Sequence, residues 1–363
     1  PRIEYDATGA VKGLLIEEAR TNLVLNSGNV STVFIKYNTQ LVASGVTVPD
    51  GSTDAYLLYP SSSGVARFVY TAAQTLTAGA TQTTSIYMKA SGVTTGLFYS
   101  SDGGGLNAVG FAWFDLSAGT VGTVVSGYTA AIEDVGNGWY RCSVSGVTLN
   151  AGYLIVGVAD ADNSTTVTKS GTDGILVWGA QAETGSFPTS YIPTSGATAT
   201  RAADVATIPT ANFGYNSDAG TVVVDFNMSF GGTNYPRAWE IGSTISGNDR
   251  INVFGYAPTG VIGTGLYTAG VNQGSATLST GNTVPTGTLK VAVAWRENDL
   301  ASVQGGGTVI VDTSATLTGG NPRTQLALGK TTTSSSNNLN GHIKSIQYYP
   351  RRLSNAQLQE LTT

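Results

Sequence analysis

The sequence predicts an all-β protein with two tandem β-sandwich, jelly-roll-like domains and a short C-terminal helix. Three observations predict this fold class: a glycine-rich composition with little charge, short apolar runs that alternate with polar residues, and one helix-capping pattern near the end of the chain. Of the 363 residues, 47 are glycine, 11% are charged and 41% are hydrophobic. This balance favours strands and tight turns over helices.

The composition also argues against several classes of protein. The single cysteine, Cys142, provides neither an intramolecular disulfide nor a CxxC site. The formal net charge is −5 and the only clustered basic residues are Arg351 and Arg352, so no nucleic-acid partner is expected. Apolar runs fall short of the roughly 18–20 residues of a membrane span, so no membrane insertion is expected. Because the chain begins at Pro1, we expect an upstream region to be missing.

Residues 1–30 are expected to form an N-terminal arm, in which Gly13–Leu23 is the stretch most compatible with a helix. Residues 31–195 are expected to form the first sandwich, because brief apolar-alternating runs recur there between turn signals. The predicted strands are Ala66–Tyr70, Thr84–Lys89, Leu97–Ser100, Phe111–Leu116, Gly138–Val144, Tyr153–Val158 and Ile175–Ala180.

A linker is expected at residues 196–204, where prolines and small polar residues interrupt the periodicity. The second sandwich then covers 205–363. Its clearest strand is Thr221–Phe230, in which alternate apolar residues predict one core face and one face in water, and Lys290–Arg296 repeats the pattern. Ser354 and Gln357 form a capping-box pattern that predicts a short helix.

The sequence resembles two families. The segments Leu289–Trp295, Gln304–Gly306, Leu326–Gly329 and Leu339–Ser354 follow one another as in the closing half of a concanavalin A-like, or laminin-G-like, jelly roll. Other phrases resemble those of bacteriophage tail-fibre and tail receptor-binding proteins, in which a carbohydrate-binding-module-like sandwich precedes a laminin-G-like one. These phrases are Gly13–Leu23, Phe114–Thr120, Gly136–Arg141 and Trp178–Thr194.

The second resemblance implies a function. It implies a receptor-binding protein of the virion tail, outside the cell, that forms a homotrimer and adsorbs to bacterial surface polysaccharide without cleaving it. Other tail proteins would attach through the missing N-terminal region. Two alternatives remain open: a purely structural tail spacer or trimerisation module, and a capsule depolymerase.

The sequence does not predict an enzyme. A Ser-His-Asp triad or a histidine-centred zinc site needs imidazole, and the lone His342 is expected to be an ordinary strand-edge residue. Glycoside hydrolysis needs two carboxyl groups several ångströms apart. Distant carboxylates could still form such a pair, and four stay unassigned: Asp102, Asp160, Asp225 and Glu240.

No cofactor is expected, although calcium is an alternative. Asp160, Asp162 and Asn163 supply closely spaced oxygen atoms of the kind that Ca²⁺ prefers, and they are the calcium candidates. Loops of this composition are mostly turns.

Glycan binding generally needs an aromatic surface surrounded by amide, carboxylate or guanidinium groups. The loop-rich stretch 231–267 has this mixture, and its candidate ligand-binding residues are Asn234, Tyr235, Arg237, Asn248, Asp249, Arg250, Tyr256 and Tyr267. A hairpin turn is expected at Gly260–Tyr267. Four tryptophans, Trp139, Trp178, Trp239 and Trp295, are assigned to the cores, and Trp113 is ambiguous.

Overall fold

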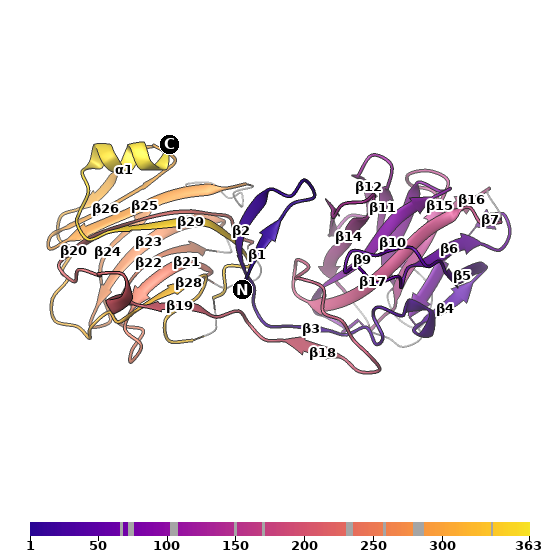
Figure 1. The fold of residues 1–363 in the computed structure, drawn as a ribbon, viewed down its shortest axis with the longest axis horizontal. Coiled ribbons are helices and arrows are strands. Elements are labelled where there is room, and N and C mark those ends of the chain that lie inside the picture. The colour runs from indigo at the N-terminus through magenta and orange to yellow at the C-terminus, as the bar shows by residue number, and fades with distance from the viewer. Residues whose placement is uncertain are drawn as a thin grey trace. The chain divides into compact units, whose positions relative to one another are not determined.

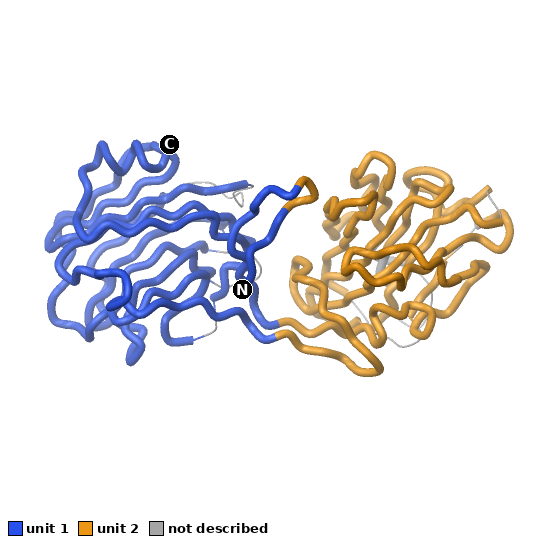
Figure 2. Tube along the Cα trace, in the orientation of Figure 1, with its two compact units in different colours: residues 1–5, 9–19, 202–363 blue, residues 6–8, 20–201 orange. Residues whose placement is uncertain are grey.

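The structure is a computed structural model that describes all residues except 66–67, 72–75, 102–107, 149–150, 169–170, 230–234, 257–258, 279–286 and 335–336. The chain forms two compact units (Figures 1 and 2). Unit 1 comprises residues 1–5, 9–19 and 202–363, and unit 2 comprises residues 6–8 and 20–201. In the described residues both units are built almost entirely of antiparallel strands, and unit 1 has one α-helix at its C-terminal end, so the predicted all-β fold class is confirmed.

Unit 2 contains two six-stranded sheets that share a core. The first has the order β12 (Thr120–Val124), β11 (Ala108–Asp115), β10 (Thr95–Ser101), β15 (Leu154–Ala159), β8 (Phe68–Thr71) and β4 (Phe34–Tyr37). The second has the order β13 (Tyr128–Asp134), β14 (Tyr140–Val147), β9 (Thr81–Ser91), β17 (Gly174–Thr184), β6 (Tyr56–Pro60) and β5 (Thr39–Ala43). All seven strands predicted for this part of the chain overlap an observed strand.

Alternating side chains from both sheets fill the core of unit 2. Phe98 and Phe114 of the first sheet and Ile86 of the second are fully buried in one apolar cluster. Two short pairs complete the unit: β16 (Thr166–Val167) with β7 (Gly64–Val65), and β18 (Ala199–Arg201) with β3 (Arg20–Asn22). A short 3₁₀ helix, η1, spans Val30–Thr32.

Unit 1 is a sandwich of a seven-stranded and a six-stranded sheet. The larger has the order β1 (Arg2–Tyr5), β2 (Val11–Ile16), β29 (Gly341–Tyr349), β20 (Ala219–Phe226), β25 (Leu289–Arg296), β26 (Asp299–Gln304) and β27 (Ile310–Asp312). The smaller has the order β19 (Ala206–Pro209), β28 (Gln325–Leu328), β21 (Arg237–Gly242), β22 (Arg250–Tyr256), β23 (Val261–Thr268) and β24 (Val271–Thr277). A second 3₁₀ helix, η2, spans Thr210–Asn212.

The outer face of the larger sheet is covered in part, which corrects the expectation of a face in water at one position of the strand at 221–230, whereas Asp225, Asn227 and Ser229 on that face are partly exposed. Val222, Val224 and Phe226 enter the main core as predicted. Val223, on the opposite face, is also buried, in a second cluster with Leu358 of helix α1 (Asn355–Thr362). The sequence predicts the helix, but its amphipathic signal does not show where it packs.

Residues 1–19 contribute strands to unit 1 where the sequence suggests an arm with helix-compatible character. Strand β2 pairs with β29 across more than 300 residues of sequence, with Leu14 opposite Ile343. Ile16 is fully buried in the main core of the unit. Gly13 has a φ of 130°, and a Cβ atom there would lie 2.7 Å from the Ile343 carbonyl oxygen, so the close approach of these strands requires glycine.

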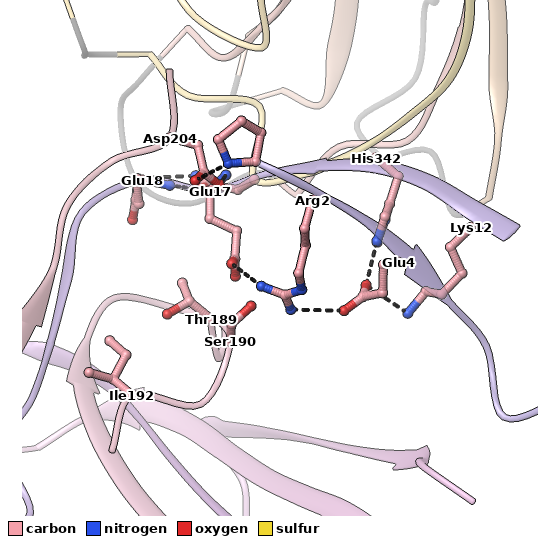
Figure 3. Close-up of polar contacts among 12 residues, drawn as sticks. Arg2, Glu4, Lys12, Glu17, Glu18, Thr189, Ser190, Ile192, Asp204 and His342 are labelled. Carbon is pink, nitrogen blue, oxygen red and sulfur yellow. Dashed lines mark hydrogen bonds and ion pairs between the residues drawn. The ribbon is translucent and has the colours of Figure 1, made fainter. Parts of the chain in front are cut away.

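Polar contacts hold the β1–β2 hairpin to β29 (Figure 3). The His342 Nε2 atom lies 2.5 Å from the Glu4 carboxylate, and Lys12 Nζ lies 3.3 Å from the same carboxylate. The hydrogen bond with His342 contributes most to lowering the pKa of Glu4 to about 2. The His342 side chain thus links β29 to β1, the strand on the far side of β2.

Candidate functional site

The predicted glycan-binding residues lie mainly on the outer face of the smaller sheet of unit 1. In β22, Ile251 and Val253 point into the core, so Arg250, Asn252, Phe254 and Tyr256 occupy the opposite face. Tyr235 precedes β21, Arg237 begins it, and Tyr267 lies opposite Arg250 on β23. Asn234 falls outside the described residues. We call this surface the outer β22 face.

An accessible aromatic pair marks one end of the outer β22 face. The Tyr235 and Tyr256 rings stack with centroids 4.9 Å apart and an interplanar angle of 23°. Tyr235 is 43% exposed. The neighbouring Phe254 ring is partly occupied by the Arg237 guanidinium, whose carbon lies 5.2 Å from the ring centroid. The tyrosine pair is therefore the part of this aromatic cluster best placed to meet a ligand.

A buried carboxylate organises the middle of the face. Glu240 is 1% exposed, and its Oε2 atom lies 3.5 Å from Arg237 Nε and 3.9 Å from Arg250 Nε. Its Oε1 atom accepts hydrogen bonds from the Thr332 amide and hydroxyl at 2.8 and 2.9 Å. Burial lowers the pKa of Arg237, and the Glu240 carboxylate opposes that effect. This network fixes both guanidinium groups beside the aromatic rings.

The network leaves two polar groups without hydrogen-bond partners among the described residues. Asn252 donates through Nδ2 to Glu240 at 3.3 Å, but its buried Oδ1 atom has no partner. The buried Arg237 Nε also forms no hydrogen bond with the described residues, although it is ion-paired with Glu240. A buried polar group left without a partner is costly. Neither atom is accessible from the surface, so the outward-facing polar group of this network is the partly exposed Arg250 side chain.

Two glycines make room for the rings. A Cβ atom at Gly263 would lie 2.7 Å from the Phe254 ring, and one at Gly265 would lie 2.8 Å from the Tyr267 ring and 3.4 Å from Asn252 Oδ1. The rings therefore pack directly against the backbone of β23. The predicted hairpin turn at 260–267 is in fact mostly this strand, with its turn at 259–260.

The other end of the face contains a second cation–aromatic contact. The Arg250 guanidinium carbon lies 3.8 Å from the Tyr267 ring centroid, and the Arg250 side chain also donates to the Gly247 carbonyl. Asn248 is exposed in the loop between β21 and β22. Asp249 is buried and accepts hydrogen bonds from the Ala269 amide at 2.7 Å and from Asn321 at 3.0 Å. Asp249 therefore stabilises the loop between β21 and β22 through these hydrogen bonds, and its side chain does not lie on the outer β22 face.

Sequence reasoning missed Asn252, Phe254 and the two glycines. A signal for the first two was present, because Arg250 and Tyr256 belong to an alternating series in which positions 252 and 254 share their face. The role of the glycines depends on which residues lie opposite them on β22, and only the strand register shows that. The assignment of Trp139, Trp178, Trp239 and Trp295 to the cores is confirmed, and Trp113 is also buried.

The calcium candidates have protein partners. The Asp160 carboxylate accepts from the Thr168 amide at 2.7 Å, and the Asp162 carboxylate accepts from the Thr123 amide and hydroxyl. Asn163 has a φ of 54°, as in a turn. In the part of the chain that the structure describes, no group of three or more His, Cys, Asp or Glu side chains could hold a metal ion.

The unassigned carboxylates do not come together in an evident pair. Glu240 is committed to the arginine network, Asp160 lies in unit 2, and Asp225 lies on β20 in the larger sheet of unit 1. Asp102 falls outside the described residues. Among the described residues, no helix is long and apolar enough to span a bilayer.

Structural comparison finds partial likenesses to β-sandwich proteins. A leech intramolecular trans-sialidase matches 42% of this chain with 16% identity and a TM-score of 0.34, and the match spans only 24% of that enzyme. The CBM40 of a Ruminococcus gnavus IT-sialidase matches 41% of this chain and 84% of its own, with 16% identity and a TM-score of 0.33. A pentraxin from Limulus polyphemus gives 11% identity, 40% and 70% coverage, and a TM-score of 0.31.

These TM-scores and sequence identities are too low to support a conclusion about function. No protein-family model matches the chain, and no curated protein matches it.

Proposed function

We propose that unit 1 binds glycans through the outer β22 face and that the chain is a receptor-binding part of a phage tail that adsorbs to bacterial surface polysaccharide without cleaving it. The observation that carries the binding proposal is the stacked, accessible Tyr235–Tyr256 pair beside a rigid polar network. The support for the tail assignment is the sequence resemblance. A homotrimer on the virion tail and attachment to other tail proteins belong to the same proposal.

The chemistry of the face suits a sugar. A pyranose ring has an apolar side that packs on aromatic rings and hydroxyl groups that both donate and accept hydrogen bonds. The tyrosine pair supplies the aromatic surface. Arg250, whose side chain is 23% exposed, supplies hydrogen-bond donors. Because the network holds these groups in place before binding, little side-chain entropy is lost on association.

Two measurements test the proposal. The purified chain is first mixed with host cells, and phage adsorption is measured. A receptor-binding protein blocks adsorption, whereas a purely structural spacer leaves it unchanged, which would contradict the proposal. The chain is then incubated with host polysaccharide, and polymer length is followed by size-exclusion chromatography. Co-elution with unchanged length is expected, and progressive shortening would favour a depolymerase.

A further inference from the structure

The smaller sheet of unit 1 has very few charged residues, and their charges do not balance. Its six strands carry three charged side chains, Arg237, Glu240 and Arg250, and all three belong to the network on the outer β22 face. Asp249, which precedes β22, is buried and hydrogen-bonded within its loop. Two guanidinium groups therefore share one carboxylate, and one positive charge is in excess on a chain whose formal net charge is −5.

The accessible charge of this network is the positive one. The Glu240 side chain is 1% exposed and that of Arg237 is 11% exposed, whereas the Arg250 side chain is 23% exposed. The pKa of Arg237 is lowered mainly by burial and further by Arg250, against the effect of Glu240. The two guanidinium groups thus repel each other, and an anion beside Arg250 would offset this repulsion.

Arg250 also has hydrogen-bond donors that the protein does not use. A guanidinium has five N–H donors. The Arg250 side chain donates to the Gly247 carbonyl, and its Nε atom lies 3.9 Å from Glu240, which is too far for a hydrogen bond. The Arg250 Nη2 group has no hydrogen-bond partner among the described residues and is not buried. These donors are therefore open to a ligand.

A partly exposed guanidinium with unused donors suits an oxyanion. Its planar N–H groups match two oxygen atoms of a carboxylate or a phosphate and can bind them through parallel hydrogen bonds. The Tyr267 ring, whose centroid lies 3.8 Å from the guanidinium carbon, helps to hold the Arg250 side chain in place. A neutral sugar hydroxyl could accept from Arg250 but would leave the excess positive charge uncompensated.

The positive group and the aromatic pair are too far apart for one sugar ring. Arg250 and Tyr256 are the first and last residues of β22. Their Cα atoms are separated by roughly 20 Å, at about 3.3 Å per residue of strand. A ligand that contacts both ends of the strand therefore has to be a polymer, with different sugar residues at the two ends.

We propose that the outer β22 face binds a segment of an anionic polysaccharide, with one sugar ring on the Tyr235–Tyr256 pair and a carboxylate or phosphate group of another sugar residue at Arg250. This inference rests on the proposed glycan binding and adds the charge of the glycan to it.

The test is an array of bacterial polysaccharides in which each acidic polysaccharide is printed beside a carboxyl-reduced copy and a dephosphorylated copy. Wild type is expected to bind at least one acidic polysaccharide, and to bind the copy that has lost its acidic group at least about tenfold more weakly. The treatment that weakens binding identifies the group as a carboxylate or a phosphate. Equal binding to native and treated copies overturns this inference but leaves glycan binding intact, whereas no binding to any polysaccharide contradicts both.

A variant of Arg250 assigns the effect to this side chain. Arg250→Gln is expected to weaken binding to the native polysaccharide about tenfold and to leave binding to the treated copy unchanged, because only the charged contact is lost. Arg296→Gln, at an exposed position on β25 of the larger sheet, removes the same charge and is the matched control. Equal losses by R250Q on native and treated copies, or equal losses by R250Q and R296Q, would contradict the proposal.

Two measurements on wild type keep the test valid if R250Q does not fold. Raising the NaCl concentration from about 50 mM to about 500 mM should weaken binding to the native polysaccharide and not to the treated copy. Free glucuronic or galacturonic acid should not displace the native polysaccharide, whereas oligosaccharides prepared from it should. Binding that is insensitive to salt contradicts an anionic ligand, and displacement by a single sugar contradicts a site that spans both ends of β22.

Discussion

At the scale of single residues, Glu240 determines the geometry of the candidate site. It is nearly fully buried, and it faces two guanidinium groups and two donors from Thr332. A buried charge is stabilised by its counter-charge, and removing one partner of a buried ion pair is strongly destabilising. Removal of the carboxylate would leave Arg237, itself 9% exposed, as a buried cation without its counter-charge.

We therefore expect Glu240→Gln to lower the free energy of unfolding by about 3–5 kcal/mol, measured by urea denaturation. The matched control is Glu360→Gln, on an exposed position of α1, which should change stability by less than about 0.5 kcal/mol. Equal and small effects for the two variants would mean that the network does not organise the face.

The Glu4–His342 contact predicts a pH dependence in the acid range. The pKa of Glu4 falls from 4.5 to about 2, chiefly through its hydrogen bond with His342. A lowered carboxyl pKa contributes stability that is fully present above pH 4.5 and is lost as the pH falls through 2. Because Glu4 is partly exposed, we expect this contribution to be about 1–2 kcal/mol.

Glu4→Gln should remove that contribution, which acid titrations of both proteins followed by thermal denaturation can measure. The stability difference between wild type and E4Q should be largest near neutral pH and should disappear towards pH 2. A difference that stays constant over this range would show that the pKa of Glu4 is not lowered in the folded protein.

The sequence predicts which residues contribute to the candidate site better than it predicts the contacts that they make. Tyr235, Arg237, Arg250, Tyr256 and Tyr267 could be selected because their chemistry suits a sugar, and the structure places all five around one face. Which partner each of them has could not be predicted, because ion pairs and ring contacts depend on the register between strands far apart in the chain.

At the scale of elements, period-two alternation predicts the strands well because each sandwich strand has one face in the core. It fails where a further layer covers the outer face. Val223 looks solvent-facing by alternation but is buried with Leu353 and Leu358. The capping box that starts α1 is observed as predicted, with the Ser354 hydroxyl accepting from the Gln357 amide and the Gln357 side chain accepting from the Ser354 amide.

Loss of this cap should loosen the covering helix. Ser354→Ala is expected to cost about 1 kcal/mol in the free energy of unfolding, because the first turn of α1 loses a partner for its amides. Ser354→Asp retains a capping oxygen and should stay close to wild type. Hydrogen exchange of the α1 amides distinguishes the two, and equal protection in S354A and S354D would contradict a capping role.

At the scale of the whole molecule, the two compact units do not follow the order of residues along the chain. Residues 1–19 lie before unit 2 in sequence, yet β2 forms part of the larger sheet of unit 1 and contributes Ile16 to its core. A pairing across more than 300 residues leaves no local sequence signal, since the hydrophobic pattern of β2 is compatible with any sheet edge.

A fragment of residues 202–363 alone should therefore be unstable relative to one in which residues 1–19 are joined to it by a flexible linker. Loss of Ile16 leaves a cavity, and loss of β2 exposes the edge of β29, so we expect a difference of at least about 3 kcal/mol. Thermal denaturation of both fragments measures it. Equal melting temperatures would mean that the hairpin is peripheral to the fold of unit 1.

The central claim is that the Tyr235–Tyr256 pair on the outer β22 face binds sugar. Its most direct test is a bacterial glycan array probed with wild type, Tyr256→Ala and, as a matched control, Tyr5→Ala, an exposed tyrosine in the other sheet of unit 1. We predict that wild type and Y5A bind the same glycans and that Y256A loses about tenfold or more in affinity for them. If Y256A and Y5A bind glycans equally well, the Tyr235–Tyr256 pair is not the binding site. If wild type binds no glycan on the array, the proposal that this face binds sugar is contradicted.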